Sequence, residues 1–301
     1  MINGILNIYK EKGFTSHDVV AKLRGIVKQK KIGHTGTLDP DAEGVLPVCL
    51  GRATKVCDLL SDKDKVYEAV LLLGRATDTQ DVSGAVLEEH ETGHLQEAEV
   101  RACIESYIGE YEQLPPMYSA LKVNGKKLYE LAREGIEVER KKRHVTIFDI
   151  EILDMELPRV KMRVHCSKGT YIRTLCHDIG QDLGTGGCME ALLRTKVSCF
   201  ELQDSLTLAQ VQEMVSNEQL DDILLPIDQM FYEYKEIHVK KKYESLALNG
   251  NPFQVKAVQE PDTYENHETV RVYDTKERFV GLFEYRSGKQ DFKVKKMFLD
   301  Q

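Results

Sequence analysis

Residues 33–47 read GHTGTLDPDAEGVLP, a stretch with three glycines and two prolines in fifteen positions. This composition excludes a regular helix or a central strand, so we predict a loop whose backbone path is specified residue by residue. Within it, Pro40 restricts the preceding Asp39 to extended backbone geometry. His34 lies in the same stretch, between glycines at positions 33 and 36. A carboxylate that is held in one orientation is suited to act as a nucleophile.

An aspartate before a proline also has an ordinary structural role. In an Asx-turn its side chain accepts a hydrogen bond from the backbone two residues on, and this is the commoner role of an Asp-Pro pair. Here Asp41 is available for such a turn, and neither Asp41 nor Glu43 precedes a proline. We therefore interpret Asp39 as a candidate catalytic carboxylate, with the Asx-turn as the alternative.

The stretch 33–47, followed by Gly51–Lys55, resembles the signature of the TruB family, the bacterial tRNA pseudouridine synthases of type B. Further blocks occur in the order of that family: Lys65–Tyr67, Arg75–Thr79, Pro116–Lys122 and Cys166–Thr174. The resemblance covers residues 4 to about 200 and is looser in the last third of the chain. It implies an α+β fold, with a catalytic domain built on a central mixed or antiparallel sheet flanked by helices, and a small C-terminal β-barrel of the PUA-like type.

Hydrophobic periodicity and turn residues indicate where the elements lie. Strands are predicted at 3–9, 46–50, 65–74, 118–123, 143–155, 159–167, 189–194 and 196–202, and helices from Thr15 to Val27 and at 52–61, 96–107, 127–133, 172–183 and 208–215. Residues 75–95 are predicted to be a polar loop. An acidic stretch that ends at Tyr234 predicts a boundary between a catalytic domain, residues 1–234, and an RNA-binding domain, residues 235–301. In that second domain, strands are predicted around 269–274, 279–285 and 291–298, as in a small barrel.

The formal net charge of −8 is unfavourable for binding RNA, because phosphate contacts normally come from lysine and arginine. The charge is unevenly distributed. Residues 76–113 contain ten acidic residues and one basic residue, and residues 201–234 contain eight acidic and no basic residues. Residues 1–60 carry +3 and residues 119–200 carry +4, so the segments with the family blocks are the basic ones.

Two basic runs, Lys28–Lys31 and Arg140–Arg143, are candidates for phosphate contacts. Each run taken alone is also compatible with an ordinary solvated surface. Seven cysteines form no Cys-x-x-Cys pair, and Cys176-His177 lacks a second pair of ligands, so we expect no disulfide framework and no metal. We also expect no cofactor. No apolar run reaches eighteen residues and no signal peptide is recognisable, so a cytoplasmic protein is expected, with a monomer as the default.

A single oriented carboxylate limits the chemistry. A glycoside hydrolase needs two carboxyl groups, and Asp39 has no comparably restrained partner. Isomerisation of a nucleoside needs only one, because the base leaves and returns within one pocket. The resemblance implies this reaction: the uracil of a uridine in the T-loop of tRNA (position 55) is detached at N1, turned, and rejoined through C5 to give pseudouridine. Asp39 would attack either C1′ of the ribose or C6 of the base.

Arg173 is expected in the first turn of a helix, where the helix dipole disfavours a cation by about 0.3–1 kcal/mol. Its placement is reasonable if it pairs with an acid, and Asp39 is our candidate. The resemblance likewise implies that Arg173 keeps Asp39 ionised and in place. The alternative is a surface arginine whose aliphatic part lies along the helix.

The resemblance also assigns roles to other residues. Tyr67 would stack on the target base and lie near the proton that is finally lost from C5. His34 would enter the space left by an extruded uridine, although an isolated histidine in a loop is most often a solvated side chain. Three more residues match substrate-contacting positions: Tyr171, Leu192 and Lys10. Core packing is the ordinary interpretation of Tyr171 and Leu192.

One departure from the family pattern lies near the N-terminus. Where the family usually has Asp-Lys-Pro, this chain has Tyr9-Lys10-Glu11, which retains the lysine and changes both of its neighbours. Two other functions are compatible with the sequence. One is a chaperone that binds and opens the tRNA elbow without chemistry, and the other is a related synthase that acts on ribosomal RNA.

Overall fold

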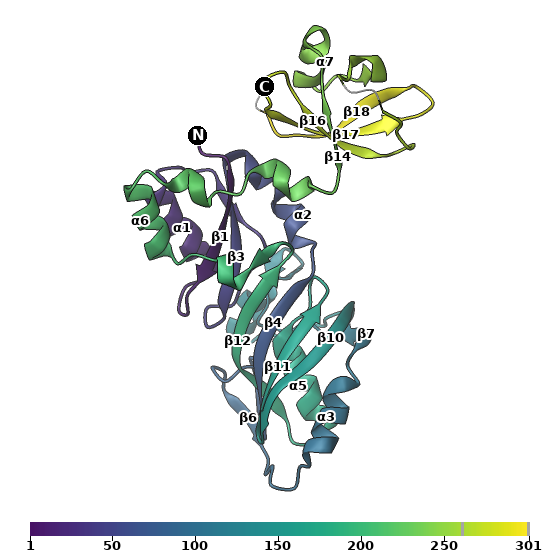
Figure 1. The fold of residues 1–301 in the computed structure, drawn as a ribbon. Coiled ribbons are helices and arrows are strands. Elements are labelled where there is room, and N and C mark those ends of the chain that lie inside the picture. The colour runs from purple at the N-terminus through teal and green to yellow at the C-terminus, as the bar shows by residue number, and fades with distance from the viewer. Residues whose placement is uncertain (260–261, 300–301) are drawn as a thin grey trace.

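The computed structural model describes residues 1–259 and 262–299, and these residues form two sheets and two small hairpins (Figure 1). The larger sheet has nine strands, in the order β1-β3-β12-β4-β11-β10-β7, with β2 paired to β3 and β13 paired to β12. Its strands are β1 (Gly4–Lys10), β2 (Ile32–His34), β3 (Glu43–Leu50), β4 (Lys65–Leu73), β7 (Gly109–Gln113), β10 (Arg143–Glu156), β11 (Arg159–Cys166), β12 (Gly187–Val197) and β13 (Phe200–Glu201). All pairs are antiparallel except β3 with β12, which is parallel. The predicted mixed central sheet is confirmed.

Helices cover this sheet in two places (Figure 1). The strands β4, β10 and β11 bury one face against α3 (Glu97–Glu105) and α5 (Ile172–Asp182). Helix α5 presents Ile172, Leu175 and Ile179 to this core, a spacing that places them on one helical stripe. Burial of each such side chain contributes about 1.5–3 kcal/mol. The strands β1 and β3 bury one face against α1 (Ser16–Ile26) and α6 (Leu208–Ser216).

The opposite face of β1 and β3 is also buried, which explains why β3 is apolar at every position from Val45 to Leu50. It packs against the 3₁₀-helix η1 (Gly51–Val56), against α2 (Cys57–Ser61) and against Phe231. Leu282 and Phe298 of the C-terminal region join the same core. In addition, the Lys55 ammonium donates a hydrogen bond to the Met297 carbonyl at 3.0 Å. The two parts of the chain are therefore in contact through an apolar cluster.

The C-terminal region forms a curled five-stranded sheet in the order β14-β16-β17-β18-β15. Its elements are β14 (Lys235–His238), α7 (Glu244–Leu248), β15 (Phe253–Gln254), β16 (Thr269–Tyr273), β17 (Phe279–Arg286) and β18 (Asp291–Met297). The predicted strands at 269–274, 279–285 and 291–298 are present within a residue or so, while a closed PUA-like barrel stays a prediction. Residues 260–261 and 300–301 of the predicted 235–301 domain lie outside the described residues.

The prediction that the whole stretch 33–47 is a loop without a central strand is wrong at both ends, and its first two residues, Gly33 and His34, belong to β2. Residues from Glu43 onward belong to β3, which lies between β1 and β12. Gly44, at φ +105°, allows β12 to approach β3 closely because it has no side chain. A Cβ atom at this position would lie 2.2 Å from the Arg194 carbonyl oxygen. On this edge, β3 pairs with β12 only at residues 43 and 44 and with β2 only at residues 48 to 50. Pro47 is tolerated because the N–H that it lacks would lie between these two ladders.

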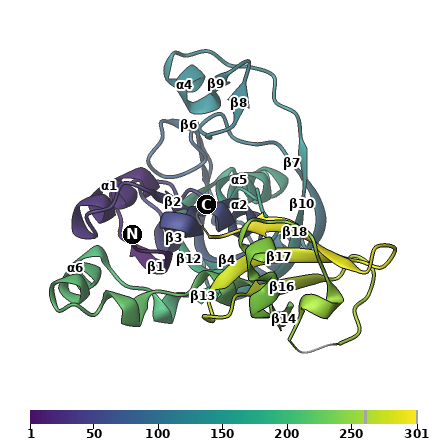
Figure 2. The same cartoon turned by 90° about the horizontal axis from the view of Figure 1, so that it is seen from above.

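Other segments also differ from the sequence prediction, and β7 was not predicted at all. The polar loop predicted at 75–95 contains a hairpin, β5 (Arg75–Thr77) with β6 (Val86–Glu89). The strand predicted at 118–123 is only β8 (Lys122–Val123), and it turns at Asn124-Gly125 into β9 (Lys126–Lys127) and α4 (Leu128–Arg133). Figure 2 shows this hairpin and α4 at the end of long connections, away from the sheet. The strands predicted at 189–194 and 196–202 are instead one strand, β12, followed by a turn and β13. Within the described residues, none of the helices has the length and apolar character needed to cross a membrane.

Candidate active site

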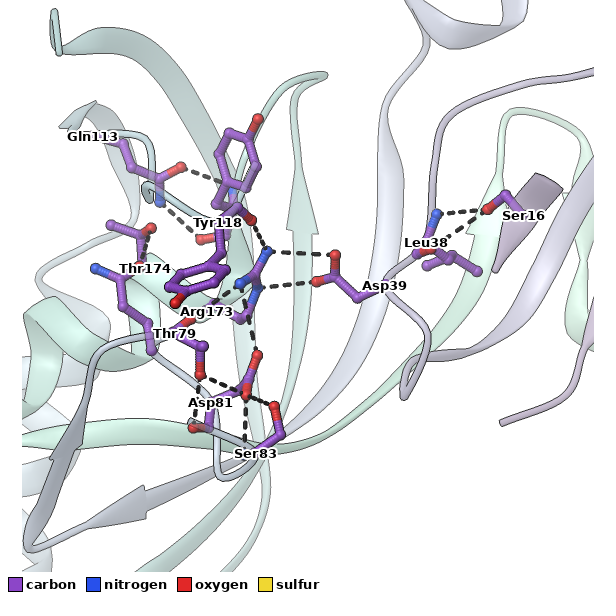
Figure 3. A network of polar contacts seen from close by, with 12 residues as sticks. Ser16, Leu38, Asp39, Thr79, Asp81, Ser83, Gln113, Tyr118, Arg173 and Thr174 are labelled. Atoms are coloured by element: carbon purple, nitrogen blue, oxygen red, sulfur yellow. Dashed lines mark hydrogen bonds and ion pairs between the residues drawn. The ribbon is translucent and has the colours of Figure 1, made fainter. Parts of the chain in front are cut away.

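The loop that carries Asp39, residues 35–42, connects β2 to β3 and is held by the first turn of α1. The Leu38 amide donates to the Ser16 hydroxyl oxygen at 3.0 Å, and the Ser16 hydroxyl donates back to the Leu38 carbonyl at 3.4 Å (Figure 3). On the other side of Asp39, the Ala42 amide donates to the Asp39 carbonyl at 3.1 Å. These contacts fix the backbone on both sides of the carboxylate. The restraint expected from Pro40 is thus supplemented by tertiary hydrogen bonds.

Lys10, at the end of β1, lies beneath the same loop. Its side chain is fully buried, and its ammonium donates to the carbonyls of Ala42 at 2.6 Å, Pro40 at 3.0 Å and Glu11 at 3.2 Å. Burial lowers the pKa of Lys10 to about 8, against the opposing effect of nearby carboxylates such as Glu43. All three donors of the ammonium are used by backbone carbonyls, so Lys10 fixes the path of the loop from below.

Arg173 stands in the first turn of α5 and forms the ion pair with Asp39 that its position predicted (Figure 3). Its Nε lies 2.9 Å from Oδ2 of Asp39, and its Nη2 donates to Oδ1 at 3.3 Å. The pair is therefore bidentate. The Arg173 side chain is only 6% exposed, whereas the Asp39 side chain is 41% exposed. The guanidinium thus supports the carboxylate from behind and leaves it accessible to a ligand.

The remaining donors of Arg173 are also engaged. Nη1 donates to the Thr79 carbonyl at 3.0 Å, and Nη2 donates to the Tyr118 carbonyl at 2.9 Å (Figure 3). Nη1 also lies 3.6 Å from Oδ2 of Asp81. Asp81 is itself held by the hydroxyls of Thr79 and Ser83. Arg173 therefore lies between two carboxylates, of which only Asp39 is substantially exposed.

Opposing influences act on the ionisation of Asp39. Burial raises the pKa of Asp39, and the positive charge of Arg173 lowers it. The negative charge of Asp81 raises the pKa of Asp39 further, while Lys10 acts in the same direction as Arg173. Arg173 is consequently the main group that favours the ionised carboxylate, the form a nucleophile requires.

Tyr67 lies near the start of β4, is buried, and pairs directly with Arg194 of β12. Burial raises the pKa of Tyr67 and the charge of Arg194 opposes this, so the phenol is protonated at neutral pH. Arg194 is itself buried, and it donates to the carbonyls of Val45 at 2.7 Å and Gly36 at 3.2 Å. Arg194 therefore connects β12, the strand paired with β4, to Gly36 in the Asp39 loop and to Val45 in β3.

His34 ends β2, and its ring makes an edge-on contact with the ring of His17, at a centroid distance of 5.5 Å and an angle of 62°. Burial lowers the pKa of His34 to about 4, with the nearby positive charges of His17 and Arg194 acting in the same direction. The imidazole is therefore neutral at physiological pH. A neutral ring loses less on leaving water than a charged one.

The other two predicted substrate residues lie at the edges of this group. Tyr171 immediately precedes α5 and is held by Gln113, whose amide accepts from the Tyr171 amide at 2.7 Å and donates to its carbonyl at 2.9 Å. Burial raises the pKa of Tyr171, and the charge of Asp39 contributes in the same direction. Leu192, in β12, is half-buried and packs against the large core, opposite Ala69.

Comparison with known proteins shows which family the chain resembles along its length. Residues 24–172 match the family model of the TruB family pseudouridylate synthase N-terminal domain, and residues 173–232 match that of the tRNA pseudouridylate synthase B C-terminal domain. A curated relative from Lachnoclostridium phytofermentans, named tRNA pseudouridine synthase B, is 54% identical over 99% of this chain and 100% of its own length. The chain belongs to the TruB family.

Other members of the TruB family are similar along the whole chain. Relatives of the same name from Alkaliphilus oremlandii and Clostridium tetani are 49% and 43% identical, over 93% and 99% of this chain and 92% and 100% of their own lengths. Among solved structures, a Cbf5-Nop10-Gar1 complex contains a chain that is 26% identical, with a TM-score of 0.72 over 98% of this chain and 85% of that one. A TruB-family pseudouridine synthase fold therefore accounts for the central sheet and its helices.

Sequence reasoning did not identify two residues at this TruB-family site, Asp81 and Arg194. Asp81 lies in the segment expected to be a polar loop, where nothing local distinguishes it from Asp78. Arg194 follows the apolar residues Ala191–Leu193 but precedes Thr195 and Lys196, so its burial also carries no local signal. Within the ranges that the structure describes, no group of three or more His, Cys, Asp and Glu side chains is arranged to hold a metal ion.

Proposed function

We propose that this protein converts uridine 55 in the T-loop of tRNA to pseudouridine, with Asp39 as the nucleophile. The observation that carries the proposal is the Asp39–Arg173 pair, in which a buried guanidinium presents an accessible carboxylate on a loop fixed from three sides. The family membership supports the reaction class, and the names of the relatives support tRNA as the substrate.

The ionised Asp39 attacks the bound uridine, at C1′ of the ribose or at C6 of the uracil. The bond between C1′ and N1 breaks, the uracil turns in the pocket, and a bond forms between C1′ and C5. The bond from Asp39 to C1′ or C6 breaks and regenerates the carboxylate, the proton on C5 is lost, and N1 gains a proton, so the product has the same atoms as the substrate. The uracil returns to the ribose it left, with no net oxidation and no external nucleophile, so the reaction calls for no cofactor or metal. We propose that the protein acts on tRNA as a monomer in the cytoplasm.

The target uridine lies within a folded loop and has to be extruded, at a cost of a few kcal/mol. We assign the insertion step to His34, whose neutral ring stacks where the base has left. Stacking of a base on an aromatic ring contributes about 1–3 kcal/mol, which offsets much of this cost. Tyr171 and Leu192 then line the pocket that receives the extruded base. Lys10 is assigned to holding the Asp39 loop, because its donors are all used by the backbone.

Tyr67 tests the later part of the mechanism. Tyr67→Phe keeps the ring that stacks on the base and removes the hydroxyl near the C5 proton. We expect RNA affinity within a few-fold of wild type and a single-turnover rate lower by about 10² or more, the usual contribution of a proton-transfer group. Rapid-quench measurement of pseudouridine with saturating enzyme provides the rate. An unchanged rate would show that only the ring of Tyr67 is needed.

Binding of tRNA should weaken steeply with salt, despite the acidic composition. Lys28, Lys30 and Lys31 are exposed, whereas Arg140 of the second run donates to the Pro115 carbonyl. Each phosphate contact contributes about −0.7 to −0.9 to the slope of log affinity against log salt. Charge reversal by Lys30→Glu should make this slope less negative by about that amount. Arg101→Glu on α3 is the control, and an equal change there would contradict specific phosphate contacts by the lysine run.

We further propose that residues 1–234 are the catalytic domain and that residues 235–301 form a PUA-like module that binds RNA. A separate apolar core inside the curled sheet supports this division, and Leu282 and Phe298 dock the module onto the catalytic domain. The basic clusters Lys240–Lys242 and Lys293–Lys296 are its candidate phosphate contacts. Removal of residues 235–301 is expected to raise KM for tRNA more than it lowers kcat.

The direct test is incubation of the purified protein with an unmodified tRNA transcript, followed by mapping of pseudouridine at single-nucleotide resolution. One new pseudouridine at position 55 is expected, and a transcript with cytidine at that position should give none. Modification of a ribosomal RNA transcript in place of tRNA would instead identify the protein as a synthase for ribosomal RNA.

A further inference from the structure

The first turn of α1 contacts both ends of the segment that carries His34 and Asp39. Ser16 exchanges two hydrogen bonds with Leu38, the residue before Asp39. The next residue, His17, is exposed, and its ring meets the ring of His34 edge-on. The helix is anchored by a capping box in which the Thr15 hydroxyl and the Asp18 carboxylate satisfy each other's backbone amides. Consecutive residues of one rigid turn therefore locate the nucleophile and the His34 ring relative to each other.

His34 has little else to fix its side chain. Its Nδ1 atom is buried and has no hydrogen-bond partner among the described residues. The chain turns at Gly36, at φ +77°, and His34 is the last residue of β2 before the Asp39 loop begins. Edge-to-face contact between aromatic rings is attractive and depends on their angle. Beside an interaction with the Gly36 backbone, the His17 ring is the aromatic contact that the described residues provide for the His34 imidazole.

We propose that His17 is a positioning residue for His34, holding its imidazole at the angle from which it enters the RNA stack when the uridine is extruded. The proposal rests on the role given to His34 in the proposed function. Its physical basis is preorganisation, because a ring that is already oriented loses less rotational freedom when it inserts. His17 acts through His34 and not on the reacting atoms, so it should influence extrusion and leave RNA affinity unchanged.

The experiment follows extrusion directly. A T-arm stem-loop with 2-aminopurine next to the target uridine becomes fluorescent when the stack opens, and the Asp39→Asn background isolates this step from chemistry. In that background, His17→Ala is expected to slow the rise in fluorescence by about 2- to 13-fold, the range set by one aromatic pair. His17→Phe should restore the rate because it retains a ring, whereas His17→Leu should not. With Asp39 intact, the single-turnover rates should follow the same order.

Two controls make the result specific. His94→Ala is the same change at an exposed histidine in the connection before α3, and it should leave the extrusion rate at the wild-type value. In the His34→Ala background, His17→Ala should cause no further loss, because the two residues act as one unit.

Several results would overturn the proposal. Full restoration by His17→Leu would show that only volume matters, and weaker RNA affinity with a normal extrusion rate would show a direct contact of His17 with RNA. Additive losses in the double variant would show that His17 acts independently of His34. A normal extrusion rate for His34→Ala would refute the insertion role of His34 and the His17 proposal with it. None of these results alters the mapping of pseudouridine by the wild-type protein, which tests the proposed function separately.

Discussion

Asp39→Asn is expected to abolish pseudouridine formation, lowering the single-turnover rate by at least about 10³-fold, the scale of loss when an enzyme loses its nucleophile. The substitution preserves the size of the side chain and the restraint from Pro40, so the loop should keep its path. The hydrogen bonds of Ser16 and Lys10 to this loop involve only its backbone. Affinity for tRNA should therefore stay within a few-fold of wild type, as measured by filter binding.

Asp41→Asn is the matched control, because Asp41 lies two residues further along the same loop and is exposed. It should retain a rate close to that of wild type. More than a few per cent of the wild-type rate in Asp39→Asn would contradict the nucleophile assignment. The same variant addresses the chaperone alternative in cells. Full cellular function of Asp39→Asn without any pseudouridine would show that binding and opening of the tRNA elbow is the required activity.

The central contact of the site could be predicted because both of its residues carry local signals. Pro40 restrains Asp39 from the next position in the chain, and the unfavourable position of Arg173 at a helix start required an acidic partner. The ion pair between them is present. Asp81 carries no such signal. Only the β5–β6 hairpin and the hydroxyls of Thr79 and Ser83 bring it to Arg173, and these are tertiary contacts.

The buried cations were harder to anticipate. Lysine and arginine are rarely fully buried, so Lys10 at a strand end is ordinarily interpreted as exposed. Its burial depends on three backbone carbonyls that converge only after the Asp39 loop has folded. Arg194 likewise depends on carbonyls more than 140 residues away along the chain. No pattern within a short window of sequence contains this information.

Elements with a strong local period were predicted well, and β3 shows where such reasoning fails. The stripe of α1 and the alternation of β10 and β11 are visible in the sequence, and these elements lie where they were expected. In β3, Gly44 and Pro47 argue against a central strand. Long-range pairing prevails there, because Gly44 provides room for the Arg194 backbone and Pro47 falls between two ladders.

Arg173→Ala is expected to lower the single-turnover rate severely and to move the acidic limb of its pH profile to higher pH. The reaction requires ionised Asp39, so the rate falls as the pH drops through the pKa of that carboxyl group. Burial raises this pKa and Arg173 lowers it. Without the guanidinium, only Lys10 still opposes the effect of burial, and the pKa of Asp39 rises further. Arg173→Lys should recover only part of the rate, because an ammonium cannot reproduce the bidentate contact.

The direction of the pH shift distinguishes the effect of the Arg173 charge on Asp39 from the structural role of Arg173. Arg173 also holds the carbonyls of Thr79 and Tyr118, so its loss would disturb the site even if it had no influence on Asp39. Asp81→Asn is the matched control, since it removes a negative charge that raises the pKa of Asp39 and should move the limb to lower pH. Opposite shifts in the two variants are the expected result. An acidic limb that remains at its wild-type position in Arg173→Ala would show that Arg173 serves to hold the two carbonyls and does not keep Asp39 ionised.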